Sequence, residues 1–298
     1  MMAGTLFLVG TPIGNLEDLS QRARRVLSEV DLVAAEDTRR TGRLLAHIGV
    51  KRPLVSFFEG NEQAKIPGLL ERLRAGESIA VVSDAGMPGL SDPGYRLVAA
   101  CIEAGIAVDV VPGPSALLSA LVVSGLPTDR FVFEGFLPRA GSHRAERLQA
   151  VAEERRTTVL FESPKRLERT LNDLRAAAGG GDRRVVVARE LTKLHQEVLR
   201  GTLTEVLAAI RGRELKGEVV LVVSGASDER SGDEEQAFDI AAGLVADGSR
   251  KRDAARQASR RTGVPAGRIY EALVSSGGQG AEAGSNREAA GRRAESSE

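Results

Sequence analysis

Short apolar segments alternate with amphipathic segments through the first part of the chain. The apolar segments are rich in Val, Leu, Ile and Ala, and they are Leu6–Val9, Leu32–Ala35, Leu54–Phe57, Ile79–Ser83 and Ala107–Val111. Runs of this length predict buried strands, and the mixed apolar and charged segments between them, such as Arg22–Val30, predict helices. Because this alternation is typical of a mostly parallel sheet covered by helices, residues 4–115 are predicted to form an α/β domain.

The same alternation continues, so a second α/β domain is predicted over residues 116–225. Its expected strands are Phe131–Phe136, Thr157–Glu162, Arg184–Arg189, Glu197–Gly201 and Val219–Val223. A helix is expected over Arg144–Arg156. The apolar segment Leu117–Val123 predicts another helix, which can serve either as an interface or as part of the core.

A different pattern follows the second domain. Residues 226–235 are polar and acidic, as in a linker, and residues 236–275 are predicted to form a small helical unit. Within it, Ala254–Tyr270 has the helix, glycine turn and helix of a helix-turn-helix. Residues 276–298 contain mainly Gly, Ala, Glu, Ser and Arg, which cannot bury a core, so they are predicted to be disordered.

Three of the predicted strands end in turns rich in glycine and proline. The segment Ser83–Gly94 contains two aspartates and two serines, and the other turns are Gly10–Asn15 and Pro112–Ala116. A strand that delivers a glycine-rich turn with a carboxylate is how an open α/β sheet builds a ligand crevice. The spacing G-x-G-x-x-G is absent, so a dinucleotide-binding fold is not supported. The alternative interpretation is tight surface turns, with Ser115 acting only as a helix N-cap.

At these turns the chain resembles the tetrapyrrole methylase superfamily. The resemblance extends from about Thr5 to Ser224 and rests on Val9–Leu16 (VGTPIGNL), Ala35–Arg39 (AEDTR), Ser83–Gly86 (SDAG) and Phe161–Arg166 (FESPKR). The segment Thr11–Asn15 departs from the Gly-Pro-Gly-Asp of precorrin methylases and favours the branch that acts on ribosomal RNA. That branch implies methylation of the ribose 2′-hydroxyl of a cytidine in the decoding region of 16S ribosomal RNA.

The resemblance also implies a cofactor, S-adenosylmethionine, which would lie between the two α/β domains. The positions that match cofactor contacts of the family are Pro12, Asp84, Gly86, Met87, Ser115, Ala116, Phe161, Leu191 and Val219. Phe161 fits equally a residue that reads the adenine and a core residue at a strand end. A homodimer is implied as well.

The acceptor side needs a different set of groups. A ribose hydroxyl is a very weak acid, so a base or a positive group beside it would help the reaction. The candidates at predicted strand ends are Asp37, Arg39, Glu162, Lys165, Glu190 and Lys193, with the base left unassigned; Glu36 and Arg189 lie beside them. The alternative for each is a structural ion pair or a solvated helix face. No spacing of His, Cys and carboxylates predicts a metal site.

Charge and composition bear on the partners. The chain carries 41 basic and 41 acidic side chains, so it is not an indiscriminate binder of polyanions. Aromatic residues are only 3%, so stacking on aromatic platforms is not expected to dominate nucleic-acid contacts. Near the C-terminus, however, basic residues gather, and they predict an RNA-binding surface: Arg250, Lys251, Arg252, Arg256, Arg260, Arg261 and Arg268.

The predicted partner is 16S ribosomal RNA or the assembled small ribosomal subunit. The basic helical unit distinguishes the hypothesis of an RNA methyltransferase from its alternatives. One alternative is a tetrapyrrole methyltransferase, which has no use for such a unit, and another is an RNA-binding accessory protein without activity. The sequence shows no signal peptide and no apolar run long enough to cross a membrane, so we expect a cytoplasmic protein without membrane partners.

Overall fold

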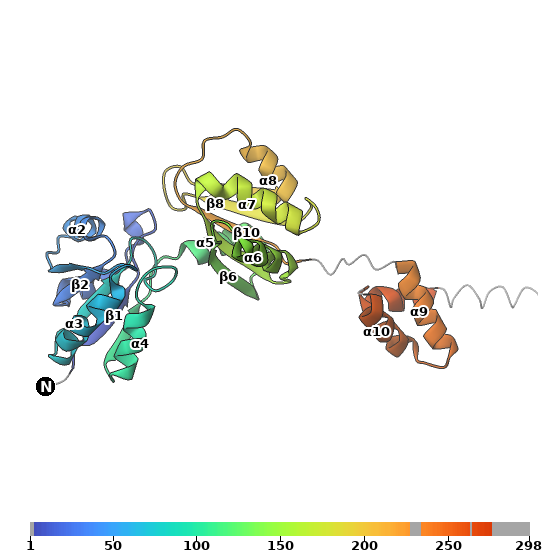
Figure 1. Ribbon diagram of the computed structural model, residues 1–298, viewed down its shortest axis with the longest axis horizontal. Coiled ribbons are helices and arrows are strands. Elements are labelled where there is room, and N and C mark those ends of the chain that lie inside the picture. The colour runs from blue at the N-terminus through green and yellow to red at the C-terminus, as the bar shows by residue number, and fades with distance from the viewer. Residues whose placement is uncertain (1–2, 227–233, 263, 276–298) are drawn as a thin grey trace, which may run out of the picture. The chain divides into compact units, whose positions relative to one another are not determined.

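The computed structural model describes residues 3–226, 234–262 and 264–275. The first sheet has five strands in the order β3-β2-β4-β1-β5, and every neighbouring pair is parallel (Figure 1). The strands are β1 (Thr5–Val9), β2 (Leu32–Ala35), β3 (Leu54–Ser56), β4 (Ile79–Val82) and β5 (Ala107–Val111). Since β1 lies between β4 and β5, the turns that follow these three strands emerge side by side.

Helices cover both faces of this sheet. They are the 3₁₀ helix η1 (Leu16–Asp18), α1 (Gln21–Glu29), α2 (Thr38–His47), α3 (Glu62–Arg74) and α4 (Tyr95–Glu103). One buried cluster contains Leu27 and Leu45 from α1 and α2, and another contains Leu69 and Leu97 from α3 and α4. Burial on both faces explains why the central strands are continuously apolar.

The second domain begins with α5 (Ala116–Ser124) and is built on a mixed sheet in the order β6-β7-β10-β8-β9. Only β6 and β7 are parallel, and the other pairs are antiparallel. The elements are β6 (Phe131–Phe136), α6 (Ser142–Glu153), β7 (Thr157–Glu162), α7 (Pro164–Ala177), β8 (Arg184–Arg189), β9 (Glu197–Thr202), α8 (Leu203–Ile210) and β10 (Val219–Val223).

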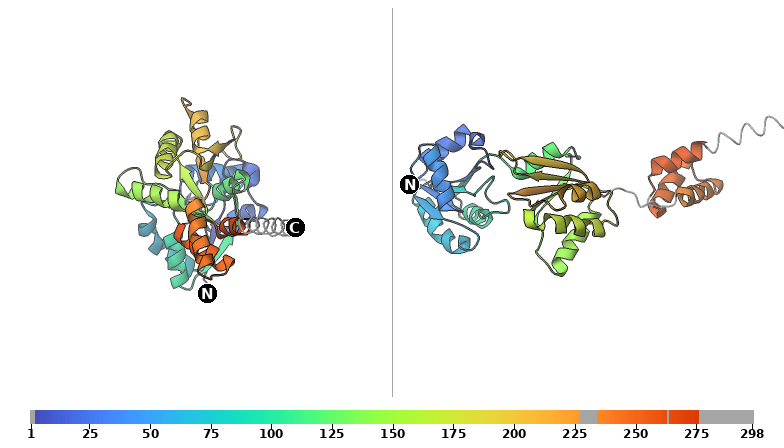
Figure 2. Two further views of the ribbon diagram at one scale, coloured as in Figure 1. Left: turned by 90° about the vertical axis from the view of Figure 1, so that its right-hand side faces the viewer. Right: turned by 90° about the horizontal axis from the view of Figure 1, so that it is seen from above.

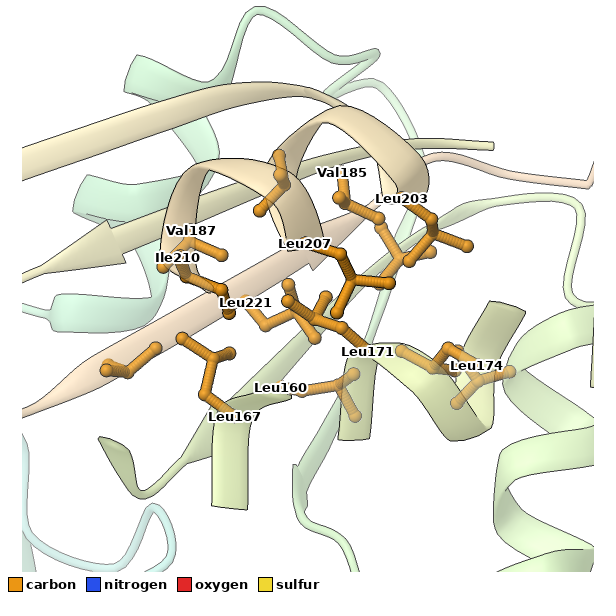
Figure 3. Packing of buried hydrophobic residues seen from close by; sticks show 14 of the residues in the cluster. Leu160, Leu167, Leu171, Leu174, Val185, Val187, Leu203, Leu207, Ile210 and Leu221 are labelled. Atoms are coloured by element: carbon orange, nitrogen blue, oxygen red, sulfur yellow. The ribbon is translucent and has the colours of Figure 1, made fainter. Parts of the chain in front are cut away.

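Two apolar clusters lie on opposite faces of this second sheet. Leucines of α7 and α8, among them Leu171 and Leu207, pack against Leu160 and Leu221 of β7 and β10 (Figure 3). The other face packs against α5, as the right-hand view of Figure 2 shows. That second cluster also contains Ile13 from the first domain, so the loop after β1 is anchored in the core of the second domain.

The C-terminal unit is a separate compact unit. It contains α9 (Glu234–Ala246), α10 (Lys251–Thr262) and a helix over residues 266–275. Its small core includes Ala237, Ala255, Ile269 and Leu273. Helix α9 begins inside the segment expected to be a linker. Gly263 of the expected turn and the tail 276–298 lie outside the described residues.

The predicted fold class, two α/β domains followed by a small helical unit, is confirmed. The main correction concerns the helix expected over Arg144–Arg156, which runs from Ser142 to Glu153. It begins after Gly141, whose φ of 88° marks a turn, and it ends because Glu154 adopts an extended conformation. The charged residues after Glu153 therefore lead into β7 rather than extending the helix.

Among the described residues, the structure contains no helix that is both long enough and apolar enough to cross a membrane.

Candidate functional site

The three glycine-rich turns are joined through their backbones. Thr11 N donates to Gly86 O at 2.9 Å, and Gly86 N donates to Thr11 O at 3.1 Å, so the turns after β1 and β4 form an isolated antiparallel bridge. Gly10 N donates to Val111 O at 3.0 Å, at the end of β5. A Cβ atom on Gly10 would lie only 2.7 Å from the Cα of Gly113. The turns after β1 and β5 therefore approach too closely for any side chain at either glycine.

The joined turns form one wall of a cavity of about 380 Å³. Its other walls come from the N-terminus of α5 and from β6, β7 and β10, so both α/β domains contribute to it. Its apolar lining includes Ile13, Leu117 and the aromatic cluster, by which we mean Phe133, Phe136 and Phe161. The first domain also contributes the acidic wall, defined by Glu36, Asp84 and Asp92. The cavity thus offers apolar surface and negative charge together.

The aromatic cluster is held by edge contacts between its rings. The Phe133 and Phe161 ring centroids lie 5.0 Å apart at an interplanar angle of 71°, and those of Phe136 and Phe161 lie 5.5 Å apart. Phe136 remains 54% exposed. An aromatic ring that keeps this much surface beside a cavity is available for stacking on a ligand.

Two carboxylates of the acidic wall are fixed by short-range partners. Asp84 accepts a hydrogen bond from Asp37 N at 3.1 Å, and its other oxygen lies 3.2 Å from Arg40 Nη1. Glu36 accepts from Asp84 N at 3.0 Å. These bonds connect the end of β2 to the end of β4. Each of the two carboxylates is held in place by a backbone N–H group from the other strand end.

Asp92, the third carboxylate, has an unusual environment. Its pKa is raised to about 7, chiefly by burial and also by the nearby charges of Glu36 and Asp84, while a hydrogen bond from the Ser83 hydroxyl partly offsets these effects. Sequence reasoning placed Asp92 in the turn but gave it no role. Nothing in the sequence could have shown that Glu36, distant in the chain, lies close enough to repel it.

A second cavity of about 440 Å³ shares Arg40 and Asp84 with the first. It is lined mainly by the turn after β1, including Pro12 and Gly14, and by α2, including Arg43. The ion pair between Arg40 and Asp84 therefore belongs to the lining of both cavities. The two cavities are adjacent compartments with different charge.

The positions expected to bind a cofactor are largely brought together. All but two line the first cavity, namely Asp84, Gly86, Met87, Ser115, Ala116, Phe161 and Val219. Pro12 lines the second cavity instead. Leu191 is buried in the apolar cluster that contains Ile13, and Phe161 packs against that cluster. Ser115 also caps α5, since its hydroxyl accepts from Leu118 N at 3.4 Å, so the cap and the cavity position coincide.

The first two residues expected to act on the acceptor lie outside both cavities. Asp37 is the N-cap of α2 and accepts from Arg39 N at 2.8 Å. That backbone bond, with the side chain of Arg39, holds the pKa of Asp37 below its usual value. The Arg39 side chain is 88% exposed. This geometry, a helix cap with an ion pair, is the one that the alternative interpretation describes.

Glu162, the last residue of β7, and Lys165, in the first turn of α7, differ in their surroundings. Glu162 lines the first cavity, but its carboxylate is buried and accepts from Thr170 Oγ1 at 2.6 Å and Ser163 N at 2.8 Å. Arg166 Nη2 lies 2.6 Å from the same carboxylate. Lys165 is exposed and does not line either cavity. Both oxygens of the Glu162 carboxylate therefore already have protein partners.

Glu190 and Lys193 form a network in the loop after β8. Lys193 Nζ lies 2.7 Å from Glu190 and 2.9 Å from Glu218. Burial works against both charges, but the mutual hydrogen bonds outweigh it, so the pKa of Glu190 is lowered and that of Lys193 is raised. The backbone of Glu190 has a φ of 53° and that of Thr192 a φ of 66°. Thr192 accepts from Asn15 N at 3.1 Å, so this loop joins the turn after β1 to the second domain.

The basic residues near the C-terminus lie on α10 and its neighbours. Arg250, Arg252, Arg256 and Arg261 are exposed. Lys251 donates to the Leu273 carbonyl at 2.7 Å, and Arg268 lies 2.8 Å from Glu234. The side chain of Arg260 lies outside the part of the chain that the structure describes. Throughout the described residues, no group of His, Cys, Asp and Glu side chains could hold a metal ion.

Comparison with known proteins identifies the class. The family model described as Tetrapyrrole (Corrin/Porphyrin) Methylases matches residues 5–207. Among solved structures, the uroporphyrin-III C-methyltransferase of Thermus thermophilus is similar with a TM-score of 0.52 and 24% identity, over 74% of this chain and 94% of that chain. A cobalt precorrin-4 methyltransferase is similar with a TM-score of 0.58 and 17% identity, over the same shares. The chain belongs to the tetrapyrrole methylase family, and it is a methyltransferase.

Within this family, the chain is similar to proteins named ribosomal RNA small subunit methyltransferase I. It is 48% identical to the Synechocystis protein over 90% of this chain and 96% of that protein. It is 45% identical to the Mycobacterium tuberculosis protein over 93% of this chain and 96% of that one. For the Thermotoga maritima protein the identity is 52% over 222 residues, which cover 74% of this chain and 99% of that protein.

Proposed function

We propose that this methyltransferase transfers a methyl group from S-adenosylmethionine to the ribose 2′-hydroxyl of a cytidine in 16S ribosomal RNA, in the decoding region of the small subunit. The observation that carries the proposal is the cavity whose lining combines an acidic wall with an aromatic cluster, beside a second compartment that shares Arg40 and Asp84. The similarity to proteins named for small-subunit ribosomal RNA supports the choice of acceptor.

The residues of the first cavity fit S-adenosylmethionine chemically. The cofactor combines a cationic sulfonium and an ammonium with a carboxylate and an adenine. Glu36 and Asp84 of the acidic wall suit the cations, and the aromatic cluster suits the adenine. The N-terminus of α5, at Ser115 and Ala116, offers backbone N–H groups and the positive end of a helix dipole to the carboxylate. When bound, the cofactor supplies an activated methyl group, so the enzyme mainly has to align donor and acceptor.

Asp84 provides the first test, because it is the acidic-wall residue that belongs to both cavities. We expect Asp84→Ala to weaken S-adenosylmethionine binding by about tenfold or more, since a hydrogen bond to a charged group contributes roughly 1.5–3 kcal/mol. Isothermal titration calorimetry measures the change. Asp129→Ala, an exposed aspartate that does not line either cavity, is the control. Equal affinity in wild type and Asp84→Ala would remove Asp84 from the cofactor site.

The nature of the product separates the proposed acceptor from the alternative. A tetrapyrrole methyltransferase is the second candidate, because the solved structures with this fold act on porphyrin and corrin precursors by their titles. We expect labelled methyl groups to appear as 2′-O-methylcytidine after reaction with small ribosomal subunits and nucleoside digestion, measured by mass spectrometry. Label on a base, or transfer only to uroporphyrinogen, would contradict the proposal.

We further propose that the C-terminal unit binds RNA and takes no part in the chemistry. Four exposed arginines lie at the start and along the length of α10, and Asp253 is the one acidic residue in that helix. Exposed arginines neutralise phosphates, and such binding weakens as salt rises. The match that covers nearly the whole Thermotoga maritima protein spans only 222 residues, which supports a catalytic unit that functions at that length.

Removal of this unit tests its role. A chain that ends at Gly225 is expected to bind S-adenosylmethionine normally, because the residues that line the cavity all precede the cut. Its apparent affinity for ribosomal subunits should fall roughly tenfold at low salt, with a shallower dependence on salt concentration. Filter binding across a salt series measures both quantities. An unchanged affinity and slope would show that the arginines of α10 are only a solvated surface.

Finally, we propose that the chain forms a homodimer through the outer face of α5. The helix has two apolar faces: Leu117 and Leu121 are buried, whereas Leu118 and Val122 are 50% and 68% exposed. Val110, on the edge strand β5, is also 47% exposed. Apolar side chains that gather on one exposed surface are typical of a protein interface. The sequence left open whether α5 packs in the core or forms an interface. Its buried face packs in the core, and its exposed face suits an interface.

A charge on the outer face of α5 tests the dimer. We expect Val122→Asp to convert the protein from dimer to monomer in light scattering, because the introduced carboxylate would be buried in the interface without a partner. Ile102→Asp is the matched control, since Ile102 is 67% exposed on another helix, α4. A wild-type mass of one chain would contradict the dimer itself.

A further inference from the structure

The strongest unexplained feature of the cavity is the carboxyl group of Asp92. It lies on the acidic wall together with Glu36 and Asp84, but it differs from both in its partners. Asp84 is paired with Arg40, and Glu36 accepts a backbone hydrogen bond. In the described part of the chain, no arginine or lysine forms an ion pair with Asp92. Its carboxylate accepts a hydrogen bond from the hydroxyl of Ser83. Asp92 therefore retains oxygens that can accept a proton or hydrogen bond from a ligand.

The turn that carries Asp92 is held rigidly. Gly94 N donates to the carboxylate of Glu62 at 3.0 Å, and Glu62 is only 5% exposed. Gly89 N donates to Pro93 O at 3.2 Å and closes the turn. Ser91, immediately before Asp92, has a φ of 64°, a conformation that a residue with a side chain adopts only when its surroundings impose it. A buried carboxylate and a strained residue thus fix where the Asp92 side chain can lie.

We propose that Asp92 is the general base that takes the proton from the acceptor hydroxyl during methyl transfer. This inference rests on the proposed function. The O–H bond of the ribose 2′-hydroxyl breaks and its proton moves to a carboxylate oxygen of Asp92. The hydroxyl oxygen forms the new bond to the methyl carbon, while the carbon–sulfur bond of the donor breaks and its electron pair stays on sulfur. The products are a methyl ether, a neutral thioether and a protonated Asp92.

The other charged groups of the cavity explain why this role falls to Asp92. Glu162 is occupied by Arg166 and Thr170, and Glu218 is paired with Lys193. On the side of the first domain, the charged groups that line the cavity with Asp92 are the carboxylates of Glu36 and Asp84 and the guanidinium of Arg40, which is paired with Asp84. Burial and the nearby negative charges of Glu36 and Asp84 raise the proton affinity of the Asp92 carboxylate.

The pH dependence of the reaction gives the first part of the test. Below pH 7 Asp92 is mostly protonated and cannot accept a proton, so the single-turnover rate should rise with pH and level off above about pH 7. The assay uses the full-length enzyme, unmethylated small ribosomal subunits and S-adenosylmethionine with a labelled methyl group. We expect Asp92→Asn to lower the rate about 100-fold and to abolish the rise with pH. Affinity for S-adenosylmethionine and for the subunit should change less than about threefold, which is roughly 0.6 kcal/mol.

The control is Asp129→Asn, an exposed aspartate outside both cavities, which should retain the wild-type rate and profile. A wild-type rate that does not vary between pH 5.5 and 8.5, or an Asp92→Asn variant that retains the wild-type rate, would overturn the role of Asp92 while leaving the proposed function intact. A wild-type enzyme that does not methylate ribosomal subunits at all would overturn the proposed function, and the role of Asp92 with it.

Thermal unfolding gives a measurement that does not depend on activity. The pKa of Asp92 is raised in the folded state, so between pH 4 and pH 7 the folded chain keeps a proton that the unfolded chain has lost. The stability of the wild type therefore decreases as pH rises through this window, and the full cost is present above pH 7. Asp92→Asn removes that cost, so its unfolding temperature should exceed that of wild type at pH 8 and match it near pH 4. A variant that is equally or less stable at pH 8 would contradict the acidic environment on which the proposal rests.

Discussion

The backbone bridge between Thr11 and Gly86 is the constraint on which the site depends. It joins the turn after β1 to the turn after β4, and the close approach of Gly10 to Gly113 adds the turn after β5. Backbone atoms come this close only where a side chain is absent. Once the three turns are joined, the acidic wall, Ile13 and the N-terminus of α5 have fixed places around one cavity. A bulky residue at Gly10 would therefore disturb the whole site rather than one contact.

Carboxylates in this protein divide by how completely the fold satisfies them. Glu162 and Glu62 are buried, yet each accepts hydrogen bonds from neighbouring groups, so they serve structure. Asp37 caps a helix. Asp92, in contrast, is partly buried beside like charges, and no arginine or lysine of the described segments forms an ion pair with it. A partly buried carboxylate beside like charges lowers the stability of the folded chain at neutral pH. Groups with such perturbed pKa values are concentrated at active sites.

Sequence pattern alone determined most of the architecture. The positions of the strands are clear in the sequence because runs such as Val219–Val223 are apolar on both faces. Glycine and proline then mark where strands end. The resemblance then identified the positions that line the cavity, including Asp84 and Phe161, because these lie in short motifs next to strand ends. Boundaries that depend on backbone conformation, such as the end of α6 at Glu153, were less well predicted.

Tertiary structure decided which charged groups remain available for chemistry. A motif shows that Glu162 and Glu190 follow strands, but their partners Arg166, Thr170 and Lys193 become evident only when the side chains are placed. The converse holds for Asp92, whose neighbour Glu36 comes from another strand end. Proton affinity depends on burial and on charges a few ångströms away in space, and neither quantity is encoded in local sequence. The sequence by itself therefore determined the fold and the family, whereas only the folded structure decided which carboxylate is free to act.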